Sequence, residues 1–121
     1  MSRHFTPREV PASEPVTLIN AFTVALEESE RFLQRWKDSA RVMAGQPGFI
    51  RARMHQSLTN NAKLRFVNVA EWDSGKALAC AQANPEWRAS VQRTLDDPTL
   101  HITSRPAVYQ VAVDVRPGDR L

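Results

Sequence analysis

Cysteine is nearly missing from this sequence, because Cys80 is the only one among 121 residues. A lone cysteine cannot form a disulfide within the chain, so the sequence does not require an oxidising compartment. No apolar run approaches the roughly 20 residues that a membrane-spanning helix needs. The N-terminal residues lack the apolar centre of a signal peptide. These absences predict a cytoplasmic protein with no membrane partner.

The net charge of the sequence is also small. The 16 Lys and Arg residues exceed the 13 Asp and Glu residues by only +3, which fits ordinary solubility. A nucleic-acid partner would need clustered positive charge, and Arg51, Arg53 and Arg65 could lie close together on a predicted hairpin. RNA-recognition domains share the strand order derived below. However, the strand after Arg65 lacks the basic-glycine-aromatic consensus whose rings stack on bases. We therefore expect no nucleic-acid partner.

Signatures of known catalytic and metal centres are absent from the sequence. It contains no glycine-rich phosphate loop and no GxSxG motif, and His4, His55 and His101 do not have the spacing of metal ligands. Cys80 lies among alanines in a predicted helix, which favours a small buried side chain over a nucleophile. The sequence predicts no metal site and no resident cofactor.

Strand and helix patterns alternate along the chain. Apolar residues at helical spacing, Phe32, Trp36, Ala40 and Met43, predict a helix that packs on the core through these side chains. Pro85 divides a later helical stretch, since proline disfavours helical geometry in the residue before it. The predicted strands cover residues 16–23, 49–58, 64–72 and 106–115, the predicted helices cover residues 27–44, 75–83 and 86–95, and a polar turn covers residues 59–62.

The order β-α-β-β-α-β is that of a ferredoxin-like α+β fold, a four-stranded antiparallel sheet with two helical segments on one face. The predicted third strand has apolar residues on both faces, since Phe66 and Ala70 alternate with Val67 and Val69. Helices can cover only one of these faces, and a wetted face would be polar. We therefore expect a homodimer in which a second copy covers the other face, with the two sheets packed face to face or joined into a barrel.

The predicted elements also divide the chain. The domain is expected at residues 16–115, after a flexible, proline-containing arm at residues 1–15 and before a short polar tail at residues 116–121.

Two asparagines stand among strand hydrophobes, Asn20 in the first strand and Asn68 in the third. Asparagine is depleted in strands, and a buried amide costs about 1–3 kcal/mol if it is left unpaired. Each amide either makes a structural hydrogen bond or orients a ligand inside an apolar pocket. Asn68 and Trp72 share a strand face with the small Ala70 between them, which leaves room for a flat polycyclic molecule.

Three further aromatic residues are candidates for contact with a ligand. Phe66 shares the strand face of Asn68, and Trp87 begins the last predicted helix, where it either forms a pocket wall or simply packs. Tyr109 lies in the last predicted strand. Its hydroxyl either needs a hydrogen-bond partner in the core or serves as a proton donor.

The sequence resembles the antibiotic biosynthesis monooxygenase family, a branch of the dimeric α/β-barrel superfamily. The similar stretches are VTLINAFTV, QPGFIRARMHQSL, RFVNVAEWDS and RPAVYQV, and they extend over nearly the whole predicted domain. The resemblance implies a ferredoxin-like fold whose dimers close a β-barrel. This agrees with the two apolar faces of the strands.

The resemblance also implies a reaction. Some members oxidise anthrone-type aromatic polyketides to quinones with O₂ and without flavin, haem or metal. The substrate supplies the electrons after losing a proton, and a dry pocket orients it and hydrogen-bonds to its developing anionic oxygen. In such members an asparagine and a tryptophan four residues apart on the third strand lie at the pocket, and Asn68 and Trp72 match them. A tyrosine six residues beyond the tryptophan also contributes, and this chain has Leu78 there.

Two alternatives remain to be compared with this oxygenase. A haem-degrading branch uses an asparagine on the first strand, which Asn20 matches, together with a tryptophan and a histidine on the second helical segment. The corresponding positions are Ala81 and Val91, so we expect no haem degradation. A dimer that binds a small molecule without catalysis fits the same residues as the oxygenase, and this alternative stays open.

Overall fold

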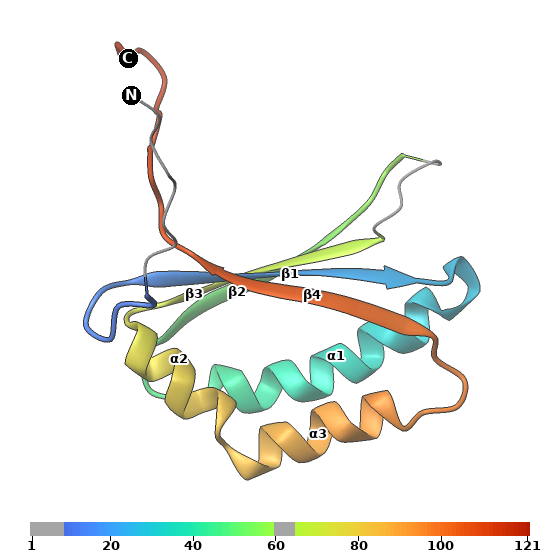
Figure 1. The fold of residues 1–121 in the computed structure, drawn as a ribbon. Coiled ribbons are helices and arrows are strands. Elements are labelled where there is room, and N and C mark those ends of the chain that lie inside the picture. The colour runs from blue at the N-terminus through green and yellow to red at the C-terminus, as the bar shows by residue number, and fades with distance from the viewer. Residues whose placement is uncertain (1–8, 60–64) are drawn as a thin grey trace, which may run out of the picture.

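The computed structural model describes residues 9–59 and 65–121. Figure 1 shows a single twisted sheet with its helices gathered on one side. No helix in the described ranges is long and apolar enough to cross a membrane. The elements are β1 (Val16–Val24), a 3₁₀ turn η1 (Leu26–Glu28), α1 (Ser29–Ala44), β2 (Phe49–Gln56), β3 (Phe66–Trp72), α2 (Gly75–Gln82), α3 (Pro85–Leu95) and β4 (Ile102–Tyr109).

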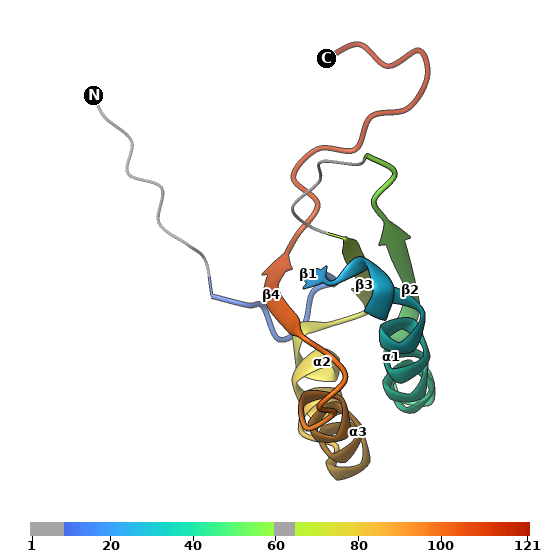
Figure 2. The ribbon, with the colours of Figure 1, turned by 90° about the vertical axis from the view of Figure 1, so that its right-hand side faces the viewer.

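The strand order in the sheet is β2-β3-β1-β4, and all neighbouring strands are antiparallel. This order confirms the predicted ferredoxin-like α+β fold. Figures 1 and 2 both place α1, α2 and α3 on the same side of the sheet. The other side, which we call the helix-free face, presents half-buried or exposed small and β-branched residues at its centre: Ile19, Ala21, Val67, Val69 and Ala107.

Local sequence explains where the helices begin and end. Ser74 caps α2 by accepting a hydrogen bond from the Ala77 backbone, and Asn84 caps α3 by accepting from the backbone N–H groups of Glu86 and Trp87. The break predicted at Pro85 is confirmed. The helix begins at the proline itself, because proline lacks only an N–H that the first helical turn leaves unpaired.

The turn between α1 and β2 depends on Gly48. Its φ is +85°, a conformation that L side chains rarely adopt, and its carbonyl accepts a 2.8 Å hydrogen bond from the Asp73 backbone. A Cβ at this position would collide with the Ala77 side chain and would lie 2.5 Å from Asp73 Oδ1. This glycine therefore lets the start of β2 approach the loop that follows β3.

The last strand differs from the prediction of residues 106–115. β4 spans Ile102–Tyr109 and pairs with β1 from Val24↔Ile102 to Thr17↔Tyr109. The first residues of β4 are mostly polar, so they lack the apolar pattern of a strand. They are tolerated because β4 is an edge strand whose side chains are largely exposed to water. Pro106 is tolerated because an edge strand has one unpaired side. The apolar alternation after Tyr109 is typical of a strand, but these valines make no sheet pairs in the described structure: Val111, Val113 and Val115.

The core between sheet and helices has two clusters. One surrounds Trp72 and includes Met43 and Leu78, and the other surrounds Phe66 and Phe32. The Phe32 and Phe66 ring centroids are 5.2 Å apart. The two clusters occupy opposite ends of the interlayer space, and the lining of the cavity described below extends between them.

The predicted N-terminal arm falls partly outside the described residues. Within them, the carbonyls of Pro11 and Ala12 accept hydrogen bonds of 3.1 Å from the backbone N–H groups of Gly75 and Lys76, at the start of α2. A Cβ at position 75 would collide with the Pro11 carbonyl. The predicted turn at residues 59–62 is described only at Thr59.

An aspartate fixes the loop between α3 and β4 to α1. Asp97 accepts hydrogen bonds from the Thr99 backbone and hydroxyl, and from Arg31 and Arg35 on α1. Its side chain is almost fully buried. The hydrogen bonds from Thr99, and then those from the two guanidinium groups, hold the pKa of the Asp97 carboxyl well below its usual range.

A second contact fixes the start of β4. The Glu28 carboxylate accepts a 2.6 Å hydrogen bond from the His101 backbone, and the His101 Nδ1 atom lies 3.0 Å from its other oxygen. The side-chain and backbone hydrogen bonds from His101 lower the pKa of Glu28. Together with Asp97, this contact sets the position of β4 relative to α1.

Candidate functional site

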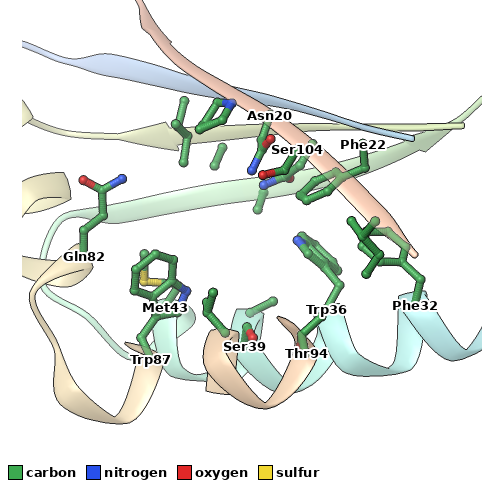
Figure 3. A pocket seen from close by; sticks show the side chains of 18 of the residues that line it. Asn20, Phe22, Phe32, Trp36, Ser39, Met43, Gln82, Trp87, Thr94 and Ser104 are labelled. Atoms are coloured by element: carbon green, nitrogen blue, oxygen red, sulfur yellow. The ribbon is translucent and has the colours of Figure 1, made fainter. Parts of the chain in front are cut away.

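A cavity of about 300 Å³ lies between the sheet and the helices, shown in Figure 3. All four strands and all three α-helices contribute to its lining, which is mostly apolar. The polar lining residues are Asn20, Ser39, Asn68, Gln82, Thr94 and Ser104. A concave apolar cavity with a few polar groups is the usual form of a small-molecule site.

Two carboxamides face this cavity from neighbouring strands. Asn20 on β1 is the direct register partner of Asn68 on β3, and Asn68 is 8% exposed. The Oδ1 atoms of both residues are buried and have no hydrogen-bond partner among the described residues. A buried acceptor without a partner costs about 1–3 kcal/mol, so a ligand that supplies donors would recover this energy. Each amide group also carries two N–H donors for a ligand oxygen.

Trp72 adds a third polar group without a partner. Its side chain is buried, and its ring packs edge-on against Phe49 with centroids 5.3 Å apart. The Nε1 atom has no acceptor among the residues that the structure describes. Trp72 follows Asn68 by four positions on the same strand face, and both line the cavity. The site therefore combines an indole N–H donor with two amides.

Aromatic side chains occupy both ends of the cavity. In Figure 3, Trp87 and Met43 lie at one end, while Trp36, Phe22 and Phe32 lie at the other. Asn20 and Ser104 lie between these ends. The arrangement suits a ligand whose polar group is near its middle and whose ends are apolar.

The described lining contains no Asp, Glu, His, Lys, Arg, Tyr or Cys. Its hydroxyl, amide and indole groups can donate or accept hydrogen bonds, but none has a pKa suited to general-base catalysis near neutral pH. Within the described ranges, no group of three or more His, Cys, Asp or Glu residues is placed to hold a metal ion.

The mouth of the cavity lies between α3 and β4. The exposed residues of the lining are on these two elements, with Leu95 on α3 and Ser104 and Pro106 on β4. Helix α3 packs mainly on α1 rather than on the sheet. At the α1–α3 contact, the buried hydroxyls of Ser39 and Ser90 lie 2.8 Å apart.

Four of the six residues singled out from the sequence meet at this cavity: Asn20, Asn68, Trp72 and Trp87. Phe66 is not in the lining, because it is completely buried in the cluster around Phe32. Tyr109 is 49% exposed and lies opposite Thr17, on the helix-free face rather than the cavity face.

Sequence reasoning missed part of the lining. Phe32 and Trp36, expected as core, border the cavity, and so do Ser39, Thr94 and Ser104. The two-residue period of β4 would have placed Ser104 on the cavity face, had the strand been assigned from residue 102. For Ser39 and Thr94, the helical period indicates a face, but nothing in the sequence indicates an open space beside it.

Comparison with known proteins gives a consistent result. The family model described as antibiotic biosynthesis monooxygenase matches residues 15–93. A candidate monooxygenase from Shewanella loihica is 30% identical, with 84% of this chain and 98% of that chain covered and a TM-score of 0.67. SnoaB, a cofactor-independent oxygenase from Streptomyces nogalater, is 25% identical, with 84% and 97% covered and a TM-score of 0.70.

A more distant similarity concerns the fold alone. A dimeric ferredoxin-like protein of unknown function from Bacteroides fragilis is 14% identical, with 80% of this chain and 96% of that chain covered and a TM-score of 0.63. No curated protein matches the sequence.

Proposed function

Because this chain belongs to the antibiotic biosynthesis monooxygenase family, we propose that it is an oxygenase that uses O₂ without a resident cofactor on a small aromatic or polyketide-like substrate. The observation that supports this most directly is a set of three buried polar atoms at an apolar cavity, none with a hydrogen-bond partner among the described residues: the Oδ1 atoms of Asn20 and Asn68, and Nε1 of Trp72. Each is a group that a bound substrate would satisfy.

The proposed reaction converts a ring CH₂ group into a carbonyl. The substrate loses a proton to give a delocalised carbanion, whose electrons reduce O₂ as a C–O bond forms. One oxygen atom stays on the ring carbon, and the other leaves as water with the two hydrogens that the carbon has lost. The substrate is thus the reductant and O₂ the oxidant.

Asn68 and Trp72 are the proposed catalytic residues. Their N–H groups would donate to the substrate oxygen that becomes negative when the proton leaves. Donors held in place in a dry site stabilise such an oxygen, and losing one costs about 10²–10³ in rate in a well-studied case. Asn20 would bind the substrate from the neighbouring strand, and Trp87 would stack against one end of it.

The lining also limits the chemistry. With no titratable side chain among the described lining residues, the proton leaves either before binding or to water at the mouth. The substrate must therefore be acidic itself, as enolisable aromatic ketones are. The cavity of about 300 Å³ is at the small end of ligand pockets, which span about 300–1,000 Å³, so a few fused rings fill it.

We further propose that the functional unit is a homodimer. The helix-free face keeps Ile19, Val67 and Val69 only half-buried in one chain, and a second copy would cover them. The dimeric ferredoxin-like protein from Bacteroides fragilis supports this assembly by analogy of fold. Two such sheets can pack face to face or join into a barrel, the two arrangements that the sequence left open.

Oxygen uptake tests the oxygenase. With anthrone, which carries the ring CH₂ group that the proposed reaction oxidises, the wild type should consume O₂ faster than the buffer does. Asn68→Ala and Trp72→Phe should each reduce the enzymatic rate by about tenfold or more. Cys80→Ser is the matched control, because Cys80 is exposed, contrary to the burial predicted from sequence, and lies outside the cavity lining. If both site variants keep the full rate, the proposed site is wrong.

A non-catalytic binding protein is the second candidate, and the absence of a base from the described lining favours it. It predicts that the same aromatic compounds raise the melting temperature without any O₂ consumption above the buffer rate. Measuring both quantities on one ligand series separates the two functions.

A further inference from the structure

Four polar residues on the sheet side of the cavity form two pairs that differ in their access to water. Asn68 and Trp72 lie on β3 and are only 8% and 1% exposed. Asn20 on β1 and Ser104 on β4 lie side by side in Figure 3, on neighbouring strands. Ser104 is exposed at the mouth of the cavity. One pair is therefore deep in the cavity, and the other reaches the mouth.

The spacing of the two pairs suits a single six-membered ring. Asn20 and Asn68 are direct partners in the antiparallel register. The Cβ atoms of such partners lie about 4.5–5.5 Å apart, which is similar to the separation of two oxygens on opposite carbons of a quinone ring. An amide donates through its N–H groups and accepts at its oxygen, so each amide can bind a carbonyl or a hydroxyl. A ring at the cavity centre can present one oxygen to each pair.

Burial decides which ring oxygen lies at which pair. Because no described lining residue titrates near neutral pH, a CH₂ proton that leaves the bound substrate passes to water, and water reaches the cavity at the mouth beside Ser104. The CH₂ carbon therefore lies near Asn20 and Ser104. The carbonyl on the opposite ring carbon then lies at Asn68 and Trp72, where donors in a drier site stabilise its developing charge more strongly.

We propose that Asn20 and Ser104 hold the second oxygen of the reaction, which O₂ adds to the ring carbon, while Asn68 and Trp72 hold the first. The inference rests on the proposed oxygenase function. It defines the ligands of the cavity as aromatic rings with oxygens on opposite carbons, and it assigns a role to Ser104, which the sequence did not single out.

The second oxygen passes through a peroxide. The ring carbanion forms a C–O bond to O₂, and the peroxide takes up a proton from water. The N–H groups of Asn20 and the hydroxyl of Ser104 donate to the peroxide oxygens. The remaining C–H proton then passes to water at the mouth, its bonding electrons form the new C=O bond, and the O–O bond breaks. The outer oxygen leaves as hydroxide and combines with a proton to give water.

Binding under argon tests this assignment without turnover. Anthrone carries one oxygen, and 9,10-anthraquinone carries a second on the opposite carbon. Ser104→Ala and Asn20→Leu should each weaken anthraquinone binding about fivefold or more, because a hydrogen bond is lost, and change anthrone binding less than about twofold. Asn68→Leu should weaken both. The matched control is Thr103→Ala, one position earlier on β4 and on the helix-free face. Quenching of tryptophan fluorescence measures affinity, since all three tryptophans line the cavity.

Turnover of anthrone gives an independent measurement. The second oxygen exists only after O₂ has added, so Ser104→Ala should lower kcat about tenfold or more and leave KM within about twofold of the wild type. Thr103→Ala should leave both constants unchanged. A Ser104→Ala variant with the wild-type kcat would overturn the role of this hydroxyl.

The outcomes separate this inference from the oxygenase. If Ser104→Ala and Asn20→Leu weaken anthrone as much as anthraquinone, or weaken neither ligand, the assignment of two ring oxygens to two pairs is wrong. A protein that shows the expected ligand dependence but consumes no O₂ would reject the oxygenase and keep the site for two ring oxygens. A protein that oxidises anthrone without that ligand dependence would keep the oxygenase and reject the inference.

Discussion

Asn20 and Asn68 lie directly opposite each other on β1 and β3, and both carboxamides face one apolar cavity. Each has a buried oxygen with no partner among the described residues. Paired amides at the centre of a sheet face weaken the core unless something binds to them. The two asparagines therefore lower the stability of the free protein and, for the same reason, favour the binding of a ligand that hydrogen-bonds to them.

Replacing Asn68 with leucine should separate stability from function. Leucine has the same branched side-chain shape and no unpaired oxygen, and its larger methyl groups can extend into the cavity, so we expect the free energy of unfolding to stay constant or rise by about 1 kcal/mol. The O₂ uptake rate should fall by about tenfold or more. Chemical denaturation and oxygen-electrode measurements on the same preparation check both. A stability loss of about 2 kcal/mol or more would mean that the amide is structural.

Filling the cavity from α3 should change substrate selection without unfolding the protein. Val91 is half-buried and lines the cavity, so the larger side chain of Val91→Phe should occupy part of it. We expect KM for the larger substrates to rise by about tenfold or more. The control is Ala89→Phe on the exposed side of the same helix. Equal KM values for the two variants across a substrate size series would contradict the assignment of this wall.

The pH dependence of turnover should follow the substrate rather than the protein. No described lining residue titrates near neutral pH, so the rate should rise with the fraction of ionised substrate. For two substrates of different acidity, the midpoints of the pH–rate profiles should differ by the difference in the substrate pKa values. A midpoint common to both would reveal a protein base outside the described lining.

Asp97→Asn should destabilise the protein at neutral pH and have less effect in acid. The hydrogen bonds from Thr99, Arg35 and Arg31 lower the pKa of Asp97 in the folded state. A lowered folded-state pKa contributes stability above the ordinary aspartate pKa of about 4, and this contribution is lost as the pH falls below it. The melting temperatures of wild type and variant should therefore converge below about pH 4.

Asp38→Asn is the control for this pH series. Asp38 pairs with Arg41 at 2.6 Å, but both side chains are largely exposed, and exposed pairs contribute little. Its melting temperature should stay close to that of the wild type at every pH.

Gly48→Ala should cost about 1–3 kcal/mol of folding free energy, because alanine is strained at a φ of +85° and its Cβ would collide with Ala77. Gly45→Ala is the matched control at the end of the same helix. Gly45 has a φ of −88°, and its added Cβ would lie 3.6 Å from the nearest atom considered, the Val42 carbonyl oxygen. We expect that variant to be neutral. Denaturant titration of both variants decides whether the turn geometry is the cause.

The element order and four residues of the cavity lining followed from sequence because they depend on local patterns. Each signal lies within one segment of the chain: Pro85 begins α3, Phe32 and Met43 share the helical period of α1, and Asn68 and Trp72 lie four positions apart on β3. The end of the sheet did not follow, because the alternating valines after Tyr109 resemble a strand more than the polar start of β4 does.

Long-range features were also beyond the sequence. The contacts of Asp97 with Arg31 and Arg35 join residues more than sixty positions apart, and no local pattern announces them. Phe66 and Asn68 share a strand face, yet one is sealed in the core and the other borders the cavity. Whether a residue on this face is buried or borders the cavity depends on where α1 and α3 lie over the sheet.

Helix α3 packs mainly on α1, so it forms a wall of the cavity that is separate from the sheet. The sheet carries the amides and the indole, whereas α3 contributes Trp87, Val91, Thr94 and Leu95 to the opposite wall. Residues of α3 can change in size without disturbing strand register. Descendants of such a gene could therefore acquire new substrates through substitutions on one helix, while the groups proposed for the chemistry stay in place.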